Sequence, residues 1–163
     1  MNIDEALKKI KDQFGGKIKR MHDRSAKRVY IDIAREDLVE CAGYMFKTIG
    51  ARFNTTSGID HPDKIELMYH FNIDQLGLII TLRTYAPKDD CVVDSLVPGV
   101  ANAFGWIERE IHELLGVDFK GSPDLRPLLL PDDWPKGQYP LRKDYKLNEA
   151  KICGIDAANT HKQ

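Results

Sequence analysis

Five of the chain's eight prolines fall within residues 118–145, and this clustering limits the possible fold of that stretch more than any other feature. Each proline removes a backbone donor and fixes φ, which excludes a long helix or a central strand. The stretch also carries many aromatic and charged side chains, unlike a low-complexity linker. Because pre-set φ angles reduce the ordering cost of binding, we expect an extended segment that lies across another protein.

Three stretches carry apolar residues at the three- and four-residue spacing of an amphipathic helix. They are residues 3–14, 35–49 and 100–115. Each is followed by a glycine, the residue that most often ends a helix. The last stretch is the most regular, since its apolar side chains fall within about 120° of the helical wheel. We therefore predict three helices, with Gly116 as the C-cap of the third.

Strand patterns fill the intervals between these helices. Period-two alternation and weaker versions of it predict strands over residues 17–22, 28–33, 52–60, 64–71 and 76–83. The polar run at 72–75 predicts a hairpin turn. This order of elements predicts an α+β fold, a mostly antiparallel sheet with helices packed on one face. We expect that domain to span 1–117, the extended docking segment 118–145, and a polar tail 146–163.

The composition excludes several classes of protein. With 24 Lys+Arg against 25 Asp+Glu the chain lacks the basic excess of a duplex-coating protein. Its apolar runs fall far short of the ~20 residues of a membrane span, and its acidic start does not match a secretory signal peptide. Cys41, Cys91 and Cys153 form no CxxC pair, which argues against a zinc ribbon, an iron–sulfur cluster and a disulfide framework. The sequence predicts a soluble protein of a reducing compartment.

Charged pairs on the third helix allow two interpretations. Glu108 and His112 are four residues apart, so they share one flank and could serve a small metal-dependent enzyme as ligands or as an acid–base pair. Arg109 and Glu113 have the same spacing, which we place on the solvent side. A zinc protease helix needs a second histidine. We therefore favour ion pairing or interface contacts for both pairs.

Two polar clusters lie in the proline-rich segment. Asp132 and Asp133 follow Pro131, which favours a turn or cap role over metal chemistry. The run from Arg142 to Tyr145 could contact nucleic acid through charge and stacking. One basic dipeptide among so many acids is a weak signal for that, so we favour charge-assisted hydrogen bonds to a protein partner and expect no nucleic acid.

Five motifs follow one another over the 38 residues from 108 to 145. They are Glu108-Arg109-Glu110, Gly116-Val117-Asp118-Phe119, Gly121-Ser122-Pro123-Asp124-Leu125-Arg126, Leu130-Pro131-Asp132-Asp133-Trp134 and Pro140-Leu141-Arg142-Lys143-Asp144-Tyr145. The series closely resembles the 30-kDa subunit family of respiratory complex I (the C subunit of NADH–quinone oxidoreductase) and its counterparts in membrane-bound NiFe hydrogenases. The α+β pattern upstream also fits, so the resemblance covers residues 1–145.

The chain departs from the complex I members of that family at three places. They usually have an aromatic residue and Asp in place of His112-Glu113, His in place of Ser122, and often Arg in place of Pro127. The stretch from Glu108 to Gly116 looks more like the energy-converting hydrogenase branch. We therefore favour a hydrogenase-type counterpart over a subunit of NADH dehydrogenase proper, and a complex I-like assembly stays the alternative.

The resemblance implies a non-catalytic scaffold with no cofactor, metal or catalytic residue of its own. Such a subunit docks on the large catalytic subunit and the small iron–sulfur subunit of the hydrophilic arm, on the cytoplasmic side of the membrane. The electron chemistry and ion pumping then lie in other chains. The docking residues that the resemblance implies are Glu108, Arg109, Glu110, His112, Asp124, Leu125, Arg126, Asp132, Asp133, Trp134, Arg142, Lys143, Asp144 and Tyr145.

Overall fold

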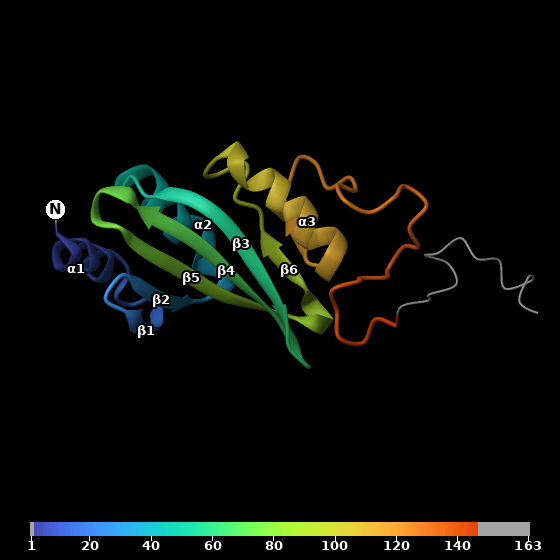
Figure 1. Ribbon diagram of the computed structural model, residues 1–163, viewed down its shortest axis with the longest axis horizontal. Helices are drawn as coiled ribbons and strands as arrows, with labels where there is room; N and C mark the ends of the chain where they lie inside the picture. The colour runs from blue at the N-terminus through green and yellow to red at the C-terminus, as the bar shows by residue number, and fades with distance from the viewer. Residues whose placement is uncertain (1, 147–163) are drawn as a thin grey trace, which may run out of the picture.

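The computed structural model describes residues 2–146 (Figure 1). Helix α1 (Ile3–Phe14) begins with a capping box, in which the Asn2 side chain accepts a hydrogen bond from the Glu5 N–H at 2.8 Å. The Glu5 carboxylate in turn accepts one from the Asn2 N–H at 3.0 Å. The pair satisfies two donors that a helix otherwise leaves unpaired at its start. The helix predicted over 3–14 is confirmed, whereas the predicted tail lies outside the described residues from 147 onward.

The second predicted helix does not form as one regular α-helix. Its three parts are a 3₁₀ turn at Arg35–Asp37, helix α2 at Leu38–Gly43 and a π-helical turn at Tyr44–Thr48. In the last part the Ile49 N–H reaches back five residues to the Tyr44 carbonyl at 3.0 Å. The buried face is the predicted one, with Leu38, Ala42 and Met45 in the core. Apolar spacing identified that face but cannot distinguish one type of helical turn from another.

Five strands form one sheet in the order β1-β2-β5-β4-β3. They are β1 (Ile18–Ser25), β2 (Arg28–Ile33), β3 (Arg52–Asp60), β4 (Lys64–Ile73) and β5 (Leu78–Pro87). The β2–β5 pair is parallel and the other three pairs are antiparallel. The predicted mostly antiparallel sheet is confirmed, including the strand expected over 52–60.

The turn between β4 and β5 lies two residues later than predicted. The ladder continues until Ile73 pairs with Leu78, and a 3₁₀ turn at Asp74–Leu76 ends at Gly77 with φ of 57°. Ile73 is buried and continues the period-two alternation of β4. The apolar face of the strand, rather than the polar composition of 72–75, therefore determines where the strand ends.

A small parallel sheet completes the fold. It pairs β6 (Val92–Asp94) with β7 (Asp118–Lys120), and helix α3 (Gly105–Leu115) lies between them in the chain (Figure 1). A 3₁₀ turn at Asn102–Phe104 occupies the start of the helix that we predicted from residue 100. Phe119 in β7 is 1% exposed, so the first residues of the 118–145 segment belong to the folded core. No helix within residues 2–146 is long and apolar enough to span a membrane.

The helices pack on one face of the five-stranded sheet. Alternate residues of β4 and β5 join buried residues of α1, α2 and α3 in a single hydrophobic core. Phe104, at the entry to α3, lies 4.0 Å from the Phe53 ring and 6.3 Å from the Phe71 ring between centroids. This aromatic cluster fixes α3 against β3 and β4 and so positions the motifs that follow it.

Candidate functional site

Glu108 lies in the core rather than on the surface. It is 1% exposed, and its carboxylate accepts hydrogen bonds from the Ser95 hydroxyl at 2.6 Å and the Leu96 N–H at 2.7 Å. Burial raises the pKa of Glu108, although these donors favour the ionised form. Glu108, which we expected among the docking residues, uses its carboxylate in this structure to hold the 95–96 loop onto α3.

Arg109 does not pair with Glu113 as the helical spacing suggested. Its guanidinium donates to the backbone carbonyls of Arg126 at 2.8 Å and Pro127 at 2.6 Å. It also lies 3.9 Å from the Asp124 carboxylate. Arg109 therefore binds the chain that follows β7, residues 121–146, which we call the strap.

Glu113 binds the strap, a contact that the sequence did not reveal. We placed it on the solvent side, but it is only 8% exposed. Its carboxylate accepts hydrogen bonds from three consecutive backbone N–H groups, those of Leu128, Leu129 and Leu130, at 2.9, 2.7 and 3.3 Å. A carboxylate that receives three such donors is well compensated for its burial. Glu113 thus holds the strap on the same flank of α3 as Arg109.

His112 and Glu108 are held by different partners and do not converge on one point. The Nδ1 of His112 donates to the Val117 carbonyl at 2.8 Å, just beyond the helix end, while the Glu108 carboxylate faces the 95–96 loop. Within residues 2–146, no three His, Cys, Asp or Glu side chains are grouped so that they could share a metal ion. The geometry gives no support to a metal or acid–base site built on this pair.

Arg142 caps the C-terminus of α3. Its guanidinium donates to the Leu115 carbonyl at 2.7 Å and lies 4.5 Å from the centroid of the Tyr139 ring. A cation at this end also complements the helix dipole. Gly116 makes the contact possible, because its φ is 72° and an added Cβ would lie 2.5 Å from the Tyr139 ring. Its predicted role as C-cap is confirmed.

The end of the strap is fixed to the sheet. The Lys143 N–H donates to the Asp60 carboxylate at 2.9 Å, and the Lys88 ammonium pairs with the other oxygen of Asp60 at 2.7 Å. Burial alone would raise the pKa of Asp60, but these two donors outweigh it and lower the pKa. Asp60, at the end of β3, is the second residue of this site that the sequence did not reveal.

Many side chains of the strap between these contacts are exposed to solvent. Asp124 and Arg126 form a bidentate pair at 2.9 and 2.8 Å, which holds the pKa of Asp124 well below its usual range. Arg126 remains 80% exposed. The predicted turn after Pro131 forms, since the Trp134 N–H donates to the Pro131 carbonyl at 2.9 Å. The other predicted docking residues are partly buried (Glu110, Leu125, Trp134, Tyr145) or exposed (Asp132, Asp133, Lys143, Asp144).

Large apolar side chains are exposed on the strap and at the start of α3. Leu129 is 62% exposed, Leu141 59% and Trp106, on the first turn of α3, 72%. A hollow of about 280 Å³ lies near the end of the strap, lined by Gly137, Gln138, Tyr139, Arg142, Asp144, Tyr145 and Lys146. The inner side of the strap is thus occupied by polar contacts with its own domain, while apolar and charged groups face outward.

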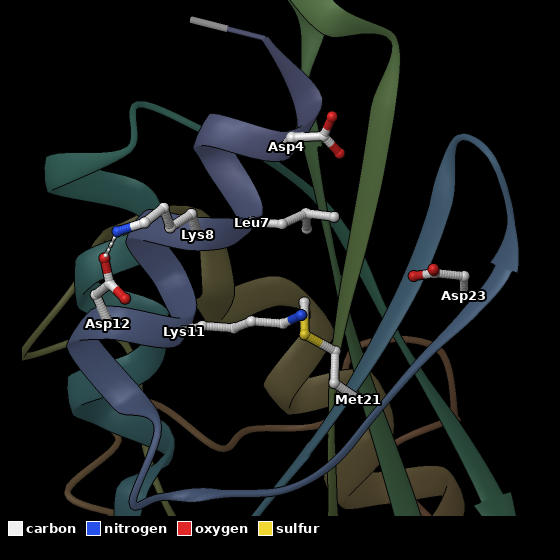
Figure 2. A pocket seen from close by; sticks show the side chains of 7 residues that line it. All are labelled: Asp4, Leu7, Lys8, Lys11, Asp12, Met21 and Asp23. Atoms are coloured by element: carbon white, nitrogen blue, oxygen red, sulfur yellow. Dashed lines mark hydrogen bonds and ion pairs between the residues drawn. The ribbon is translucent and has the colours of Figure 1, made fainter.

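A second hollow shares no residue with these motifs. Its volume is about 470 Å³, and it is lined by Asp4, Leu7, Lys8, Lys11, Asp12, Met21 and Asp23. Figure 2 shows it between α1 and β1, with Lys8 paired to Asp12 at 2.6 Å and Lys11 extended toward Met21. Its lining mixes charges of both signs, and they do not converge on one point as they would around a bound ion.

The comparisons with known proteins agree with the motif series. The family described as respiratory-chain NADH dehydrogenase, 30 Kd subunit, matches residues 31–151. The C subunit of NADH-quinone oxidoreductase from Geobacter sulfurreducens is 33% identical over 88% of this chain and 90% of that protein. The beta subunit of membrane-bound hydrogenase from Pyrococcus furiosus is 32% identical over 85% and 83%. The C subunit of F(420)H(2) dehydrogenase from Methanosarcina mazei is 42% identical, over 56% and 58%.

Solved structures share the fold. A chain of the archaeal membrane-bound sulfane sulfur reductase superposes with a TM-score of 0.78 at 22% identity, over 98% of this chain and 95% of that one. A trypsin-resistant fragment of Nqo5 superposes with a TM-score of 0.58 at 19% identity, over 77% and 100%. Family match, curated relatives and fold all agree: this chain belongs to the 30-kDa subunit family of respiratory-chain NADH dehydrogenase.

Proposed function

We propose that this chain is a non-catalytic structural subunit of a membrane-bound multi-subunit redox complex, and that its strap docks on the large catalytic subunit. The relatives are named as subunits of quinone-reducing, hydrogenase and F(420)H(2)-oxidising enzymes, which supports a subunit role. The observation that carries the proposal is that the strap has one side bound to its own domain and another side exposed to solvent. Arg109, Glu113 and Arg142 hold its inner side, and Arg126 and Leu129 face outward.

A strap held in this way suits docking for a physical reason. Association loses affinity when a loop must be ordered at the moment of binding, and a loop already held by its own domain avoids much of that cost. Exposed Leu side chains beside an exposed Arg provide the apolar and charged contacts that protein interfaces use. The small iron–sulfur subunit would be the second partner, and the complex would lie on the cytoplasmic side of the membrane.

Overall sequence identity does not distinguish a hydrogenase from a quinone-reducing complex. Identity to the hydrogenase subunit and to the quinone-reductase subunit differs by only one percentage point, 32% against 33%. The hydrogenase branch therefore rests on the motif from Glu108 to Gly116. The relevant electron donor would be identified by which enzyme activity co-purifies with the native chain.

The experiment that tests the proposal measures recovery of the large catalytic subunit on the tagged full chain. Arg126→Ala removes an exposed guanidinium from the strap, so recovery should fall several-fold while the thermal unfolding midpoint stays constant. Arg24→Ala, an exposed arginine on β1, is the matched control and should not change recovery. Equal recovery with wild type and both variants would count against the strap as the docking surface.

A further inference from the structure

The five residues from Arg126 to Leu130 are the most tightly held part of the strap. Arg109 binds the carbonyls of Arg126 and Pro127, and Glu113 binds the N–H groups of the next three residues. Arg109 and Glu113 are one helical turn apart, so they lie on the same flank of α3. One cation therefore holds consecutive carbonyls and one anion holds consecutive N–H groups, which fixes the backbone path of this turn.

This backbone path determines which leucine faces outward. Leu128 and Leu130 are half-buried, whereas Leu129 between them is 62% exposed. The shortest of the three bonds to Glu113, 2.7 Å, comes from the N–H of Leu129 itself. The most exposed leucine within residues 2–146 thus lies in a turn whose backbone is held by Arg109 and Glu113.

We propose that Leu129 is the apolar anchor of the docking surface, and that Glu113 is the positioning residue that holds it in place. The inference rests on the proposed function and names the contact on which that function depends. A side chain that its own domain already holds in place loses little freedom when it enters a pocket on a partner.

The charges around Leu129 indicate the chemistry of its partner. Arg126 precedes it as an exposed cation, and the exposed carboxylates of Asp132 and Asp133 follow it. The complementary surface is an apolar pocket with an acidic group on one side and a basic group on the other.

A double-mutant cycle tests the assignment on the tagged full chain, titrated against the complex purified without it. Leu129→Ala should weaken binding roughly tenfold, as expected for the loss of a few buried methyl groups, and leave amide protection at 128–130 unchanged. Glu113→Gln should speed amide exchange at 128–130 and weaken binding. The double variant should bind no more weakly than Leu129→Ala alone, because Glu113 acts through Leu129. Ile59→Ala, an exposed aliphatic residue on β3, is the matched control and should bind normally.

Each alternative result has a distinct meaning. Additive losses in the double variant would show that Glu113 does not act through Leu129, which overturns the inference. Normal binding by Leu129→Ala together with a loss in Arg126→Ala would also overturn it, while leaving the proposed function standing. Normal binding by all of these variants would contradict the proposed function itself. Self-association of the isolated chain that disappears in Leu129→Ala would assign the anchor to a second copy and likewise overturn the inference.

Discussion

The backbone N–H of Lys143 donates to the buried carboxylate of Asp60, which lies 83 residues earlier in the chain, at 2.9 Å. This bond joins the last part of the strap to the end of β3, and Lys88 completes the pairing of Asp60 at 2.7 Å. A side chain at a strand end therefore fixes the position of the end of the strap. The connection makes the strap part of the fold rather than an appendage.

Asp60→Ala should destabilise the protein by about 1–3 kcal/mol, because it leaves the Lys143 N–H and the Lys88 ammonium without their acceptor. Urea unfolding followed by circular dichroism measures the change. Asp74→Ala is the matched control, since Asp74 pairs with Arg52 at 2.9 Å but both side chains are more than half exposed. That variant should change stability by less than about 1 kcal/mol. Equal losses from the two substitutions would argue that Asp60 contributes no more than a surface pair.

Gly116→Ala should be more costly than Gly50→Ala, although both glycines have φ of 72°. At Gly50 an added Cβ meets nothing within 4 Å, so only the left-handed backbone is penalised, by about 1–2 kcal/mol. At Gly116 the same Cβ would also displace Tyr139 and Arg142. The difference between the two variants in thermal unfolding midpoint measures how much the close packing of the strap against α3 contributes to stability. A difference of zero would mean that the strap does not pack against the end of α3 in solution.

Ionisation of the buried Glu108 should lower the free energy of unfolding as the pH rises. Burial raises its pKa in the folded protein, so its contribution is complete below the unfolded value of about 4.5 and is lost as the pH rises through the folded value. Wild type should therefore lose stability relative to Glu108→Gln above about pH 4.5, by at most about 1.4 kcal/mol per pH unit. Urea unfolding of both proteins between pH 4 and 8 provides the test. Parallel curves would contradict a raised pKa.

The sequence predicted most helices and strands well because these elements depend on local patterns. Helix α1, the end of α3 at Gly116 and the five strands follow from periodicity and from glycine placement. The errors occurred where tertiary contacts override composition. Ile73 keeps β4 in register through a stretch whose polar residues predicted a turn, and a π-helical turn interrupts the pattern of 35–49.

The contacts between α3 and the strap were predicted only in part, for a related reason. The four-residue spacing of Arg109 and Glu113 correctly places them on one flank, but it does not show that the strap returns to cover that flank. For the same reason, spacing did not reveal that the 95–96 loop covers Glu108. A carboxylate that binds consecutive backbone N–H groups leaves no signature in the sequence, because every residue type except proline carries such a group.

The outer side of the strap is, in our proposal, covered by a neighbouring subunit. Hydroxyl-radical footprinting of the native complex against the isolated full chain tests this claim most directly, with Ile59 as the internal reference. We predict that Leu129 and Leu141 become several-fold less reactive in the complex, while Ile59 keeps its reactivity. Equal labelling of Leu129 and Leu141 in the two samples would contradict the claim.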